Sequence, residues 1–160
     1  MCPTHRFGKF EAQALYLGNQ AVLSLFATGS TTGTVLDAGE GVTHTVPIYE
    51  GYAIPHFITE IPICGRDLTY YLVELLHNAY PAYLPNDTKE KRDEAYDVAV
   101  KIKHMYGEVA HDFDAELKTA GDENSTTPKR YRLPGSQTIT VNRQCLECPE
   151  ILFQPSNWGA

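Results

Sequence analysis

The residues best suited to chemistry lie in one short stretch, LDAGEGVTHTV (36–46), where two β-branched runs flank a loop with two glycines and two acids. Gly39 and Gly41 can adopt positive φ, which turns successive backbone N–H groups toward one point and makes an anion nest that suits phosphate. Asp37 would be repelled there unless a divalent cation lay between, and magnesium binds few protein oxygens while keeping several waters. The stretch is therefore compatible with a phosphate hairpin that holds a cation. An ordinary acidic turn is the alternative, because Gly and Asp are common turn residues.

His44 follows the loop on the returning strand, and a histidine there has two interpretations. An imidazole serves as a general base only where it reaches a proton on the substrate. In the sequence His44 stands between two threonines and has no ionisable neighbour. Its spacing leaves a catalytic base and a buried structural histidine both open.

The cysteines offer a second candidate site. Cys145 and Cys148 have zinc-knuckle spacing, but a structural zinc ion needs four ligands, and no second Cys-x-x-Cys or histidine pair follows. Two unrelated thiols are the simpler interpretation. With Cys2 and Cys64 the chain has 4 cysteines, which do not form the dense framework of a small secreted domain. We expect them to be reduced, as in a cytoplasmic protein.

The composition limits the partners. The 160 residues suffice for one domain with a single core. The net charge of −7 argues against nucleic acid and anionic membranes, because both bind proteins through charge neutralisation. No apolar run is long enough to span a bilayer, and the N-terminal MCPTHRFGKF lacks the hydrophobic segment of a signal peptide. A small nucleotide held by backbone amides and a metal is still compatible with this charge.

Hydrophobic periodicity and chain breakers predict the elements that position the hairpin. They are a strand over 12–17, a helix over 20–27 that Asn19 caps and Gly29 ends, and a β-hairpin with strands over 34–37 and 42–49.

Three helices and a second hairpin are predicted further along the chain, each helix with an apolar stripe. The stripes are Leu68, Leu72, Leu75, Leu76 and Ala79 in a helix over 65–80; Ala95, Val98, Ala99, Ile102 and Tyr106 in a helix from about Thr88; and Val109, Phe113 and Leu117 in a third helix. Residues 120–129 are expected to form a surface loop, 130–133 and 138–141 a hairpin, and CPEILFQPSNWGA to begin with a proline-led helical turn.

One long stretch of the sequence resembles the actin family. QAVLSLFATGSTTGTVLDAGEGVTHTVPIYEGYAIPH is similar to actins, and GRDLT, LP, TITV and CPEILFQPS continue the match in order, over about residues 7–159 with an insertion around 80–94. Actins share with sugar kinases and heat-shock chaperones a two-lobed α/β fold on a ribonuclease-H-like core. The resemblance implies that ATP or ADP and Mg²⁺ (or Ca²⁺) lie in the cleft between two β-hairpins.

The resemblance also implies a division of the chain. Residues 1–27 match the end of the small lobe, 28–63 the first part of the large-lobe core with its phosphate hairpin, and 64–160 the inserted helical outer subdomain. The fold class is then α/β, with mixed α+β elements and an incomplete core. The first phosphate hairpin and the adenosine loop have no counterpart in the 160 residues, so we expect a fragment of a divergent actin or the product of a truncated gene.

Specific residues acquire roles through this resemblance alone. The backbone amides of the loop would bind phosphate, Asp37 would hold the waters of the cation, and Gln20 and His44 would orient and help deprotonate the attacking water. Gly65 and Lys103 would line the nucleotide pocket. The amides concerned belong to Gly39, Glu40, Gly41 and Val42.

The chain departs from the actin pattern at four of the matched positions. Ala38 and Glu40 replace the serine and the second aspartate of the usual Asp-Ser-Gly-Asp-Gly, which keeps both glycines and the metal-side acid. His104 stands where a glutamate is expected to bond the ribose, and Val100 where an arginine is usual. These two changes affect the recognition of ribose.

Two classes of function follow from the resemblance. The first is a cytoplasmic, cytoskeletal filament subunit that is an ATPase when complete, with other actin subunits and actin-binding proteins as partners. The second is a non-hydrolysing, actin-related interaction protein. Gln20, Asp37 and His44 favour the first class, whereas Val100, His104 and the expected truncation favour the second.

Overall fold

The computed structural model describes residues 14, 16–82, 84, 88–121 and 128–158. They form two compact units: the first contains the described residues up to Ala38 together with Thr43–Ile61, and the second contains Gly39–Val42 together with the described residues from Pro62 onward. Residues 12, 13 and 15 of the strand expected over 12–17 lie outside the described residues, and the other three belong to no strand.

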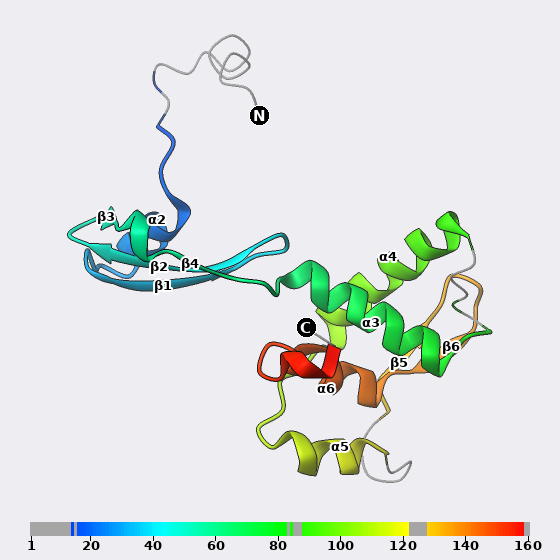
Figure 1. Cartoon of the computed structure of the whole chain (residues 1–160). Helices are drawn as coiled ribbons and strands as arrows, with labels where there is room; N and C mark the ends of the chain where they lie inside the picture. Colours follow the sequence, from blue (N-terminus) through cyan, green and yellow to red (C-terminus); the bar gives the residue numbers. More distant parts are fainter. Residues whose placement is uncertain (1–13, 15, 83, 85–87, 122–127, 159–160) are drawn as a thin grey trace. The chain divides into compact units, whose positions relative to one another are not determined.

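The first unit begins with helix α2 (Gln20–Ala27), at the bounds the sequence predicts (Figure 1). Asn19 caps it by accepting a hydrogen bond from the backbone N–H of Ala21 at 2.9 Å. Gly29, with φ of 81°, lies in the left-handed conformation that commonly follows a helix end. The cap signals therefore fix both ends of this helix.

An antiparallel sheet packs against α2. Its strands are β1 (Gly33–Ala38), β2 (Thr43–Tyr49), β3 (Tyr52–Ala53) and β4 (Thr59–Ile61), with the short 3-10 helix η1 (Pro55–Phe57) before β4. β2 pairs with the other three strands. Ala21 of the helix and Val46 and Ile48 of β2 form the small buried core of this unit. The predicted hairpin of β1 and β2 is confirmed.

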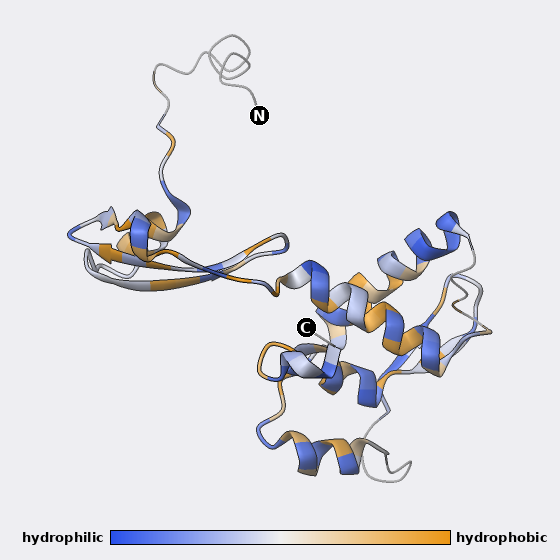
Figure 2. Cartoon of the chain, viewed as in Figure 1, coloured by the Kyte–Doolittle hydropathy of each residue, from blue (hydrophilic) through white to orange (hydrophobic). Residues whose placement is uncertain are grey.

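The second unit is built from four helices and a short hairpin. They are α3 (Gly65–Ala79), α4 (Lys89–Tyr106), α5 (Phe113–Gly121), β5 (Arg130–Arg132), β6 (Thr138–Thr140) and α6 (Asn142–Glu150), followed by the 3-10 helix η2 (Pro155–Trp158). Figure 2 shows the hydrophilic first turns of α4, which carry its charge run. Among the described residues, no helix is both long and apolar enough to cross a membrane.

The core of the second unit confirms most of the predicted stripes. Ala95, Val98, Ala99 and Ile102 of α4 are buried against Leu72 and Leu76 of α3, and residues of β6 and α6 complete the cluster. Two stripe residues differ. Ala79 is exposed because α3 ends there, and Val109 is 52% exposed because it lies before α5 rather than inside it.

Helix α6 begins earlier than predicted, and its proline lies at the other end. The chain turns helical at Asn142, so Pro149 stands in the last turn instead of leading the helix. A proline there cannot donate to the carbonyl four residues earlier, which belongs to Cys145. That carbonyl accepts the backbone N–H of Glu108 at 3.2 Å instead. The contact ties the segment after α4 to α6 and offsets the lost helical bond.

Candidate nucleotide site

The first unit brings three of the predicted residues together. The amide Nε2 of Gln20 donates to Oδ1 of Asp37 at 3.5 Å, and Nε2 of His44 lies 4.0 Å from Oδ2 of the same carboxylate. The side chains of His44 and Asp37 are 30% and 23% exposed. The carboxylate therefore lies between an amide and an imidazole, with part of its surface open to solvent.

Local structure explains this cluster. Asp37 and His44 are directly opposite each other in the β1–β2 register, so their side chains stand on the same face of the sheet. Gln20 is the first residue of α2, which packs against that face. The structure thus gives His44 a carboxylate neighbour that its sequence position does not show.

The tip of the hairpin belongs to the second unit, where it caps α3. The carbonyls of Gly39 and Glu40 accept the backbone N–H groups of Gly65 and Arg66, each at 2.9 Å. These two donors open the helix and have no partner within it. The tip is therefore held by the first turn of α3, which places the predicted residues Gly39, Glu40 and Gly65 side by side.

The predicted nest geometry is wrong in one respect. Gly39 and Gly41 do not have positive φ, since Gly29 and Gly51 are the glycines in that region among the described residues. The N–H of Gly39 donates to the carbonyl of Val42 at 2.9 Å, so the turn closes without left-handed residues. The amides of Glu40, Gly41 and Val42 have no acceptor within the described part of the chain.

The Glu40 side chain adds a network that the sequence did not reveal. Its carboxylate accepts the hydroxyl of Tyr96 at 3.1 Å and lies 3.5 Å from Nζ of Lys103. The same Nζ donates to the carbonyl of Gly65 and to Oγ1 of Thr69, both at 2.7 Å. Lys103, with its side chain 13% exposed, thus has three acceptors within the chain.

Tyr96 is the site residue that sequence reasoning missed. It packs against Tyr70 with ring centroids 5.3 Å apart. Burial raises the pKa of Tyr96, and the hydrogen bond to Glu40 raises it further. In the sequence, Tyr96 is marked only by its position on the predicted helix, two turns before Lys103. That position does not show that its hydroxyl bonds Glu40, 56 residues away.

A glycine is required at position 65 because atoms of the hairpin tip lie close to its Cα, and not because of its φ angle. A Cβ there would lie 2.7 Å from Oε2 of Glu40, 3.2 Å from its Cα and 3.3 Å from the carbonyl of Gly39. The side-chain atom can move, but the two backbone atoms belong to the tip that caps α3.

We expect Gly65→Ala to lower the free energy of unfolding by about 1–2 kcal/mol, the usual cost of overpacking. Amide exchange at the tip should become faster, because the tip must move away from α3. Urea denaturation and hydrogen exchange measure both effects. Asn78→Ala, at an exposed position of the same helix, is the control and should be neutral. A Gly65→Ala protein as stable as the parent would contradict the close packing.

The positions that depart from the actin pattern lie outside this network. His104 is exposed on α4, and Val100 is partly buried on the same helix. In the described part of the chain, the His104 side chain makes no polar contact with the tip residues, and the Val100 side chain is apolar.

The cysteine pair is enclosed by the helical core. Cys145 and Cys148 are both 1% exposed, and Sγ of Cys148 donates to the carbonyl of Leu68 at 3.4 Å. Burial raises the pKa of Cys145 to about 11 and that of Cys148 to about 12, so both are thiols at neutral pH. Among the described residues, no group of three or more His, Cys, Asp or Glu side chains could hold a metal ion.

A comparison with protein-family models identifies the family of the chain. The family model described as Actin matches residues 5–160, almost the whole chain. Members of this family generally bind a nucleotide and a divalent metal. The mixed helices and antiparallel sheet are consistent with a partial actin fold of the α/β class. The chain belongs to the actin family.

Proposed function

We propose that this chain supplies the phosphate and metal hairpin of an actin-type nucleotide site. The observation that supports this most is the cluster in which Asp37 lies within 4.0 Å of both His44 and Gln20. The resemblance to actins implies that these three residues share one site, with Asp37 beside the cation and Gln20 and His44 beside the attacking water. The fold brings them together through strand register and helix packing.

The residues fit a hydrated divalent cation and a phosphate. Asp37 contacts a neutral amide and an imidazole, and no Lys or Arg pairs with it in the described part of the chain. Its carboxylate can therefore accept hydrogen bonds from the waters of Mg²⁺ or Ca²⁺. The tip amides of Glu40, Gly41 and Val42, which have no acceptor among the described residues, are donors for the phosphates of ATP or ADP.

Gln20 and His44 are proposed to act on water. The Gln20 amide can orient a water molecule by hydrogen bonding, and the His44 imidazole can accept a proton from it. A bound metal ion would stabilise negative charge on the phosphate. Asp37 holds both groups in place through the contacts at 3.5 and 4.0 Å.

Lys103 is proposed to line the nucleoside side of the site together with Gly65. Its ammonium is held by Gly65, Thr69 and Glu40, so it contributes a fixed positive charge beside the tip rather than a mobile arm. Glu40 and Tyr96 would then position this charge and the tip together.

A second candidate function rests on the same lysine. All three N–H groups of Lys103 have acceptors within the chain, and the ribose position carries an exposed histidine, His104. Because these N–H groups are already bonded within the chain, Lys103 is not free to donate to a nucleotide, which favours an actin-related interaction protein that does not hydrolyse ATP. Phosphate release that depends on bound MgATP would exclude this candidate.

The wider role follows from family membership. We propose that other actin-like subunits and actin-binding proteins are the partners, that the protein acts in the cytoplasm as part of the cytoskeleton, and that hydrolysis accompanies filament assembly. Residues 1–27, 28–63 and 64–160 are proposed as the end of the small lobe, the start of the large-lobe core and the outer subdomain. Nucleic acid is not among the proposed partners, because the net charge of the chain, −7, disfavours binding to phosphate backbones.

Calorimetry on the 160-residue chain tests how much of the site it contains. One hairpin offers few of the contacts that a closed clamp makes, and each missing charge-assisted bond costs about 1.5–3 kcal/mol. We therefore expect MgATP to bind more weakly than about 100 µM, and phosphate release to stay at background. A stoichiometric, magnesium-dependent signal in the low micromolar range would show that this hairpin suffices alone.

A further inference from the structure

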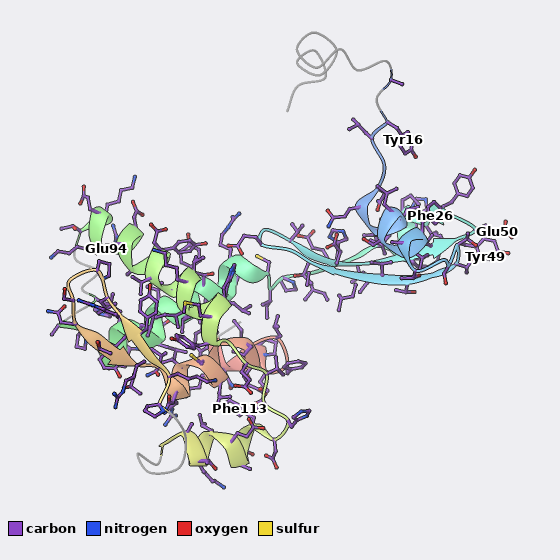
Figure 3. All side chains as sticks on the ribbon, turned by 180° about the vertical axis from the view of Figure 1, so that it is seen from behind. Tyr16, Phe26, Tyr49, Glu50, Glu94 and Phe113 are labelled. Atoms are coloured by element: carbon purple, nitrogen blue, oxygen red, sulfur yellow. The ribbon has the colours of Figure 1, made fainter. Side chains whose placement is uncertain are left out.

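A groove in the second unit is lined by two arginines. It has a volume of about 520 Å³, and residues from the ends of α3 and α5, the hairpin of β5 and β6 and the start of α6 surround it. Tyr80, Arg130, Asn142 and Arg143 are among its lining residues, whereas no residue of the phosphate-hairpin tip is. Figure 3 shows these elements with their side chains, the β5–β6 hairpin in orange and α5, which begins at Phe113, in yellow-green.

The charge of this part of the chain is opposite to that of the whole. The net charge of the chain is −7, but residues 128–146 contain no Asp or Glu. The cationic residues of this segment are Lys129, Arg130, Arg132 and Arg143. Lys129 pairs with Glu108 at 2.7 Å and does not line the groove. Among the described residues, the two arginines are the charged side chains that line the groove, so its charge is positive.

The strand register places Arg130 on the outer face of the hairpin. It is opposite Thr140 in the β5–β6 pair, and both residues are exposed, whereas Tyr131 and Ile139 pack against the helical core. The backbone carbonyl of Arg130 accepts the hydroxyl of Tyr106 at 3.0 Å, which anchors the strand. The guanidinium has no acceptor in the described part of the chain, so all five of its N–H groups are available to a ligand.

Two more donors at the start of α6 are held in place. Nε of Arg143 donates to Glu147 at 2.8 Å, which orients the guanidinium and leaves the N–H groups of its Nη atoms for a ligand. Oδ1 of Asn142 accepts the backbone N–H of Lys129 at 2.7 Å, which fixes the amide and leaves its Nδ2 donor. Glu147 compensates the charge of Arg143, whereas Arg130 has no such partner within the described residues. The groove therefore presents several donors and an uncompensated positive charge.

A phosphate group suits this set of donors better than a carboxylate. A phosphate monoester carries about −1.5 to −2 charges at pH 7 and three strong acceptor oxygens, and a guanidinium can bond it through two N–H groups. A carboxylate has a single charge and two oxygens. The volume is within the range of sites for small molecules. Tyr80, Ala120 and Pro128 add apolar surface, and the hydroxyl of Tyr80 is fixed by its bond to the carbonyl of Thr140 at 2.6 Å.

We propose that this groove binds a small phosphate monoester. Arg130, Arg143 and Asn142 hold the phosphate group, and the organic part packs against Tyr80 and Pro128. The site does not depend on the nucleotide hairpin, because it shares no residue with it.

The test is an NMR titration of the isotope-labelled 160-residue chain with phenyl phosphate, benzoate and inorganic phosphate. Phenyl phosphate should shift the amides of 130–132 and 140–144 and saturate with a dissociation constant of about 1 mM, as expected for a ligand of this size. Benzoate has the same ring and should bind about fivefold more weakly, because it offers fewer oxygens and less charge. Inorganic phosphate should also bind about fivefold more weakly, because it lacks the ring and its apolar contact.

Two pairs of variants assign the contacts. Arg130→Gln should weaken the binding of phenyl phosphate about tenfold, through the loss of a charge-assisted pair. Arg132→Gln is its matched control, because Arg132 is exposed on the same face of the same strand but does not line the groove. Arg143→Gln should weaken binding about fivefold, whereas Arg92→Gln, at an exposed position of α4, should not change it. Because Arg130 is exposed, its variant should fold like the parent.

Several results would overturn the proposal. The absence of shifts up to about 20 mM phenyl phosphate would exclude the site, since this range covers the expected affinity. Equal losses for Arg130→Gln and Arg132→Gln would show attraction by general charge rather than a built site. Benzoate that binds as tightly as phenyl phosphate would assign the groove to carboxylates. Shifts confined to the amides of Glu40, Gly41 and Val42 would place the phosphate at the hairpin tip instead.

Discussion

Replacing Ile102 with alanine should lower the free energy of unfolding by about 3 kcal/mol, as for other large-to-small changes in a core. Ile102 is fully buried in the cluster of α3, α4 and α6, so the truncated side chain leaves a cavity. Lys103 is the next residue of α4, and it holds Glu40 and Gly65. The loss of packing should therefore also increase amide exchange at the hairpin tip.

Urea denaturation followed by circular dichroism measures the stability of this variant. Lys101→Ala is the matched control, because Lys101 is exposed on the same helix and its change should stay within about 0.5 kcal/mol. A loss below about 1 kcal/mol for Ile102→Ala would be too small for a buried isoleucine. It would contradict the core assigned to this unit.

Replacing Asp37 with asparagine should remove most of the magnesium dependence of ATP binding. The substitution keeps the shape of the side chain and its contact with Gln20, but it removes the charge that faces the cation. We expect the dissociation constant for MgATP to rise about tenfold, which corresponds to about 1.4 kcal/mol. Binding of ATP without metal should stay unchanged or become tighter, because the repulsion between carboxylate and phosphate is lost.

Titrations by NMR, with magnesium and with a chelator, separate the two effects for Asp37→Asn. Glu74→Gln on the exposed side of α3 serves as the control and should leave both affinities unchanged. An equal loss of affinity with and without metal would refute the assignment of Asp37 to the cation. It would make the carboxylate a structural neighbour of Gln20 and His44.

Local signals predicted the elements that carry the site. Asn19 and Gly29 mark the ends of α2, and Thr88 caps α4 by accepting from the N–H of Lys91 at 3.4 Å. The two β-branched runs that flank the glycine-rich acidic loop predicted the β1–β2 hairpin. Such features depend on residues a few positions apart, which a sequence displays directly.

Long-range contacts explain what the sequence did not predict. The Glu40 network joins residues 56 and 63 positions apart, and no local pattern specifies which side chains meet. The start of α6 at Asn142 also involves such a contact, because Oδ1 of Asn142 accepts the backbone N–H of Lys129, 13 positions earlier, at 2.7 Å. Tertiary contacts decide these features.

The hairpin glycines show a different limit. Gly39 and Gly41 permit positive φ but do not adopt it, because the tip closes through its own hydrogen bond and caps α3. A glycine in a sequence indicates freedom or close approach, and the two cannot be distinguished without the neighbours. At Gly65 the contacts show that close approach is the reason.

The most direct measurement is an NMR titration of the 160-residue chain with MgATP to about 20 mM, a concentration that saturates a millimolar site. The account predicts shifts at the unpaired amides of Glu40, Gly41 and Val42 and at Asp37 and His44, with a millimolar dissociation constant that weakens when magnesium is chelated. Shifts confined to residues outside the hairpin, or none at this concentration, would contradict the claim that the hairpin binds phosphate and metal.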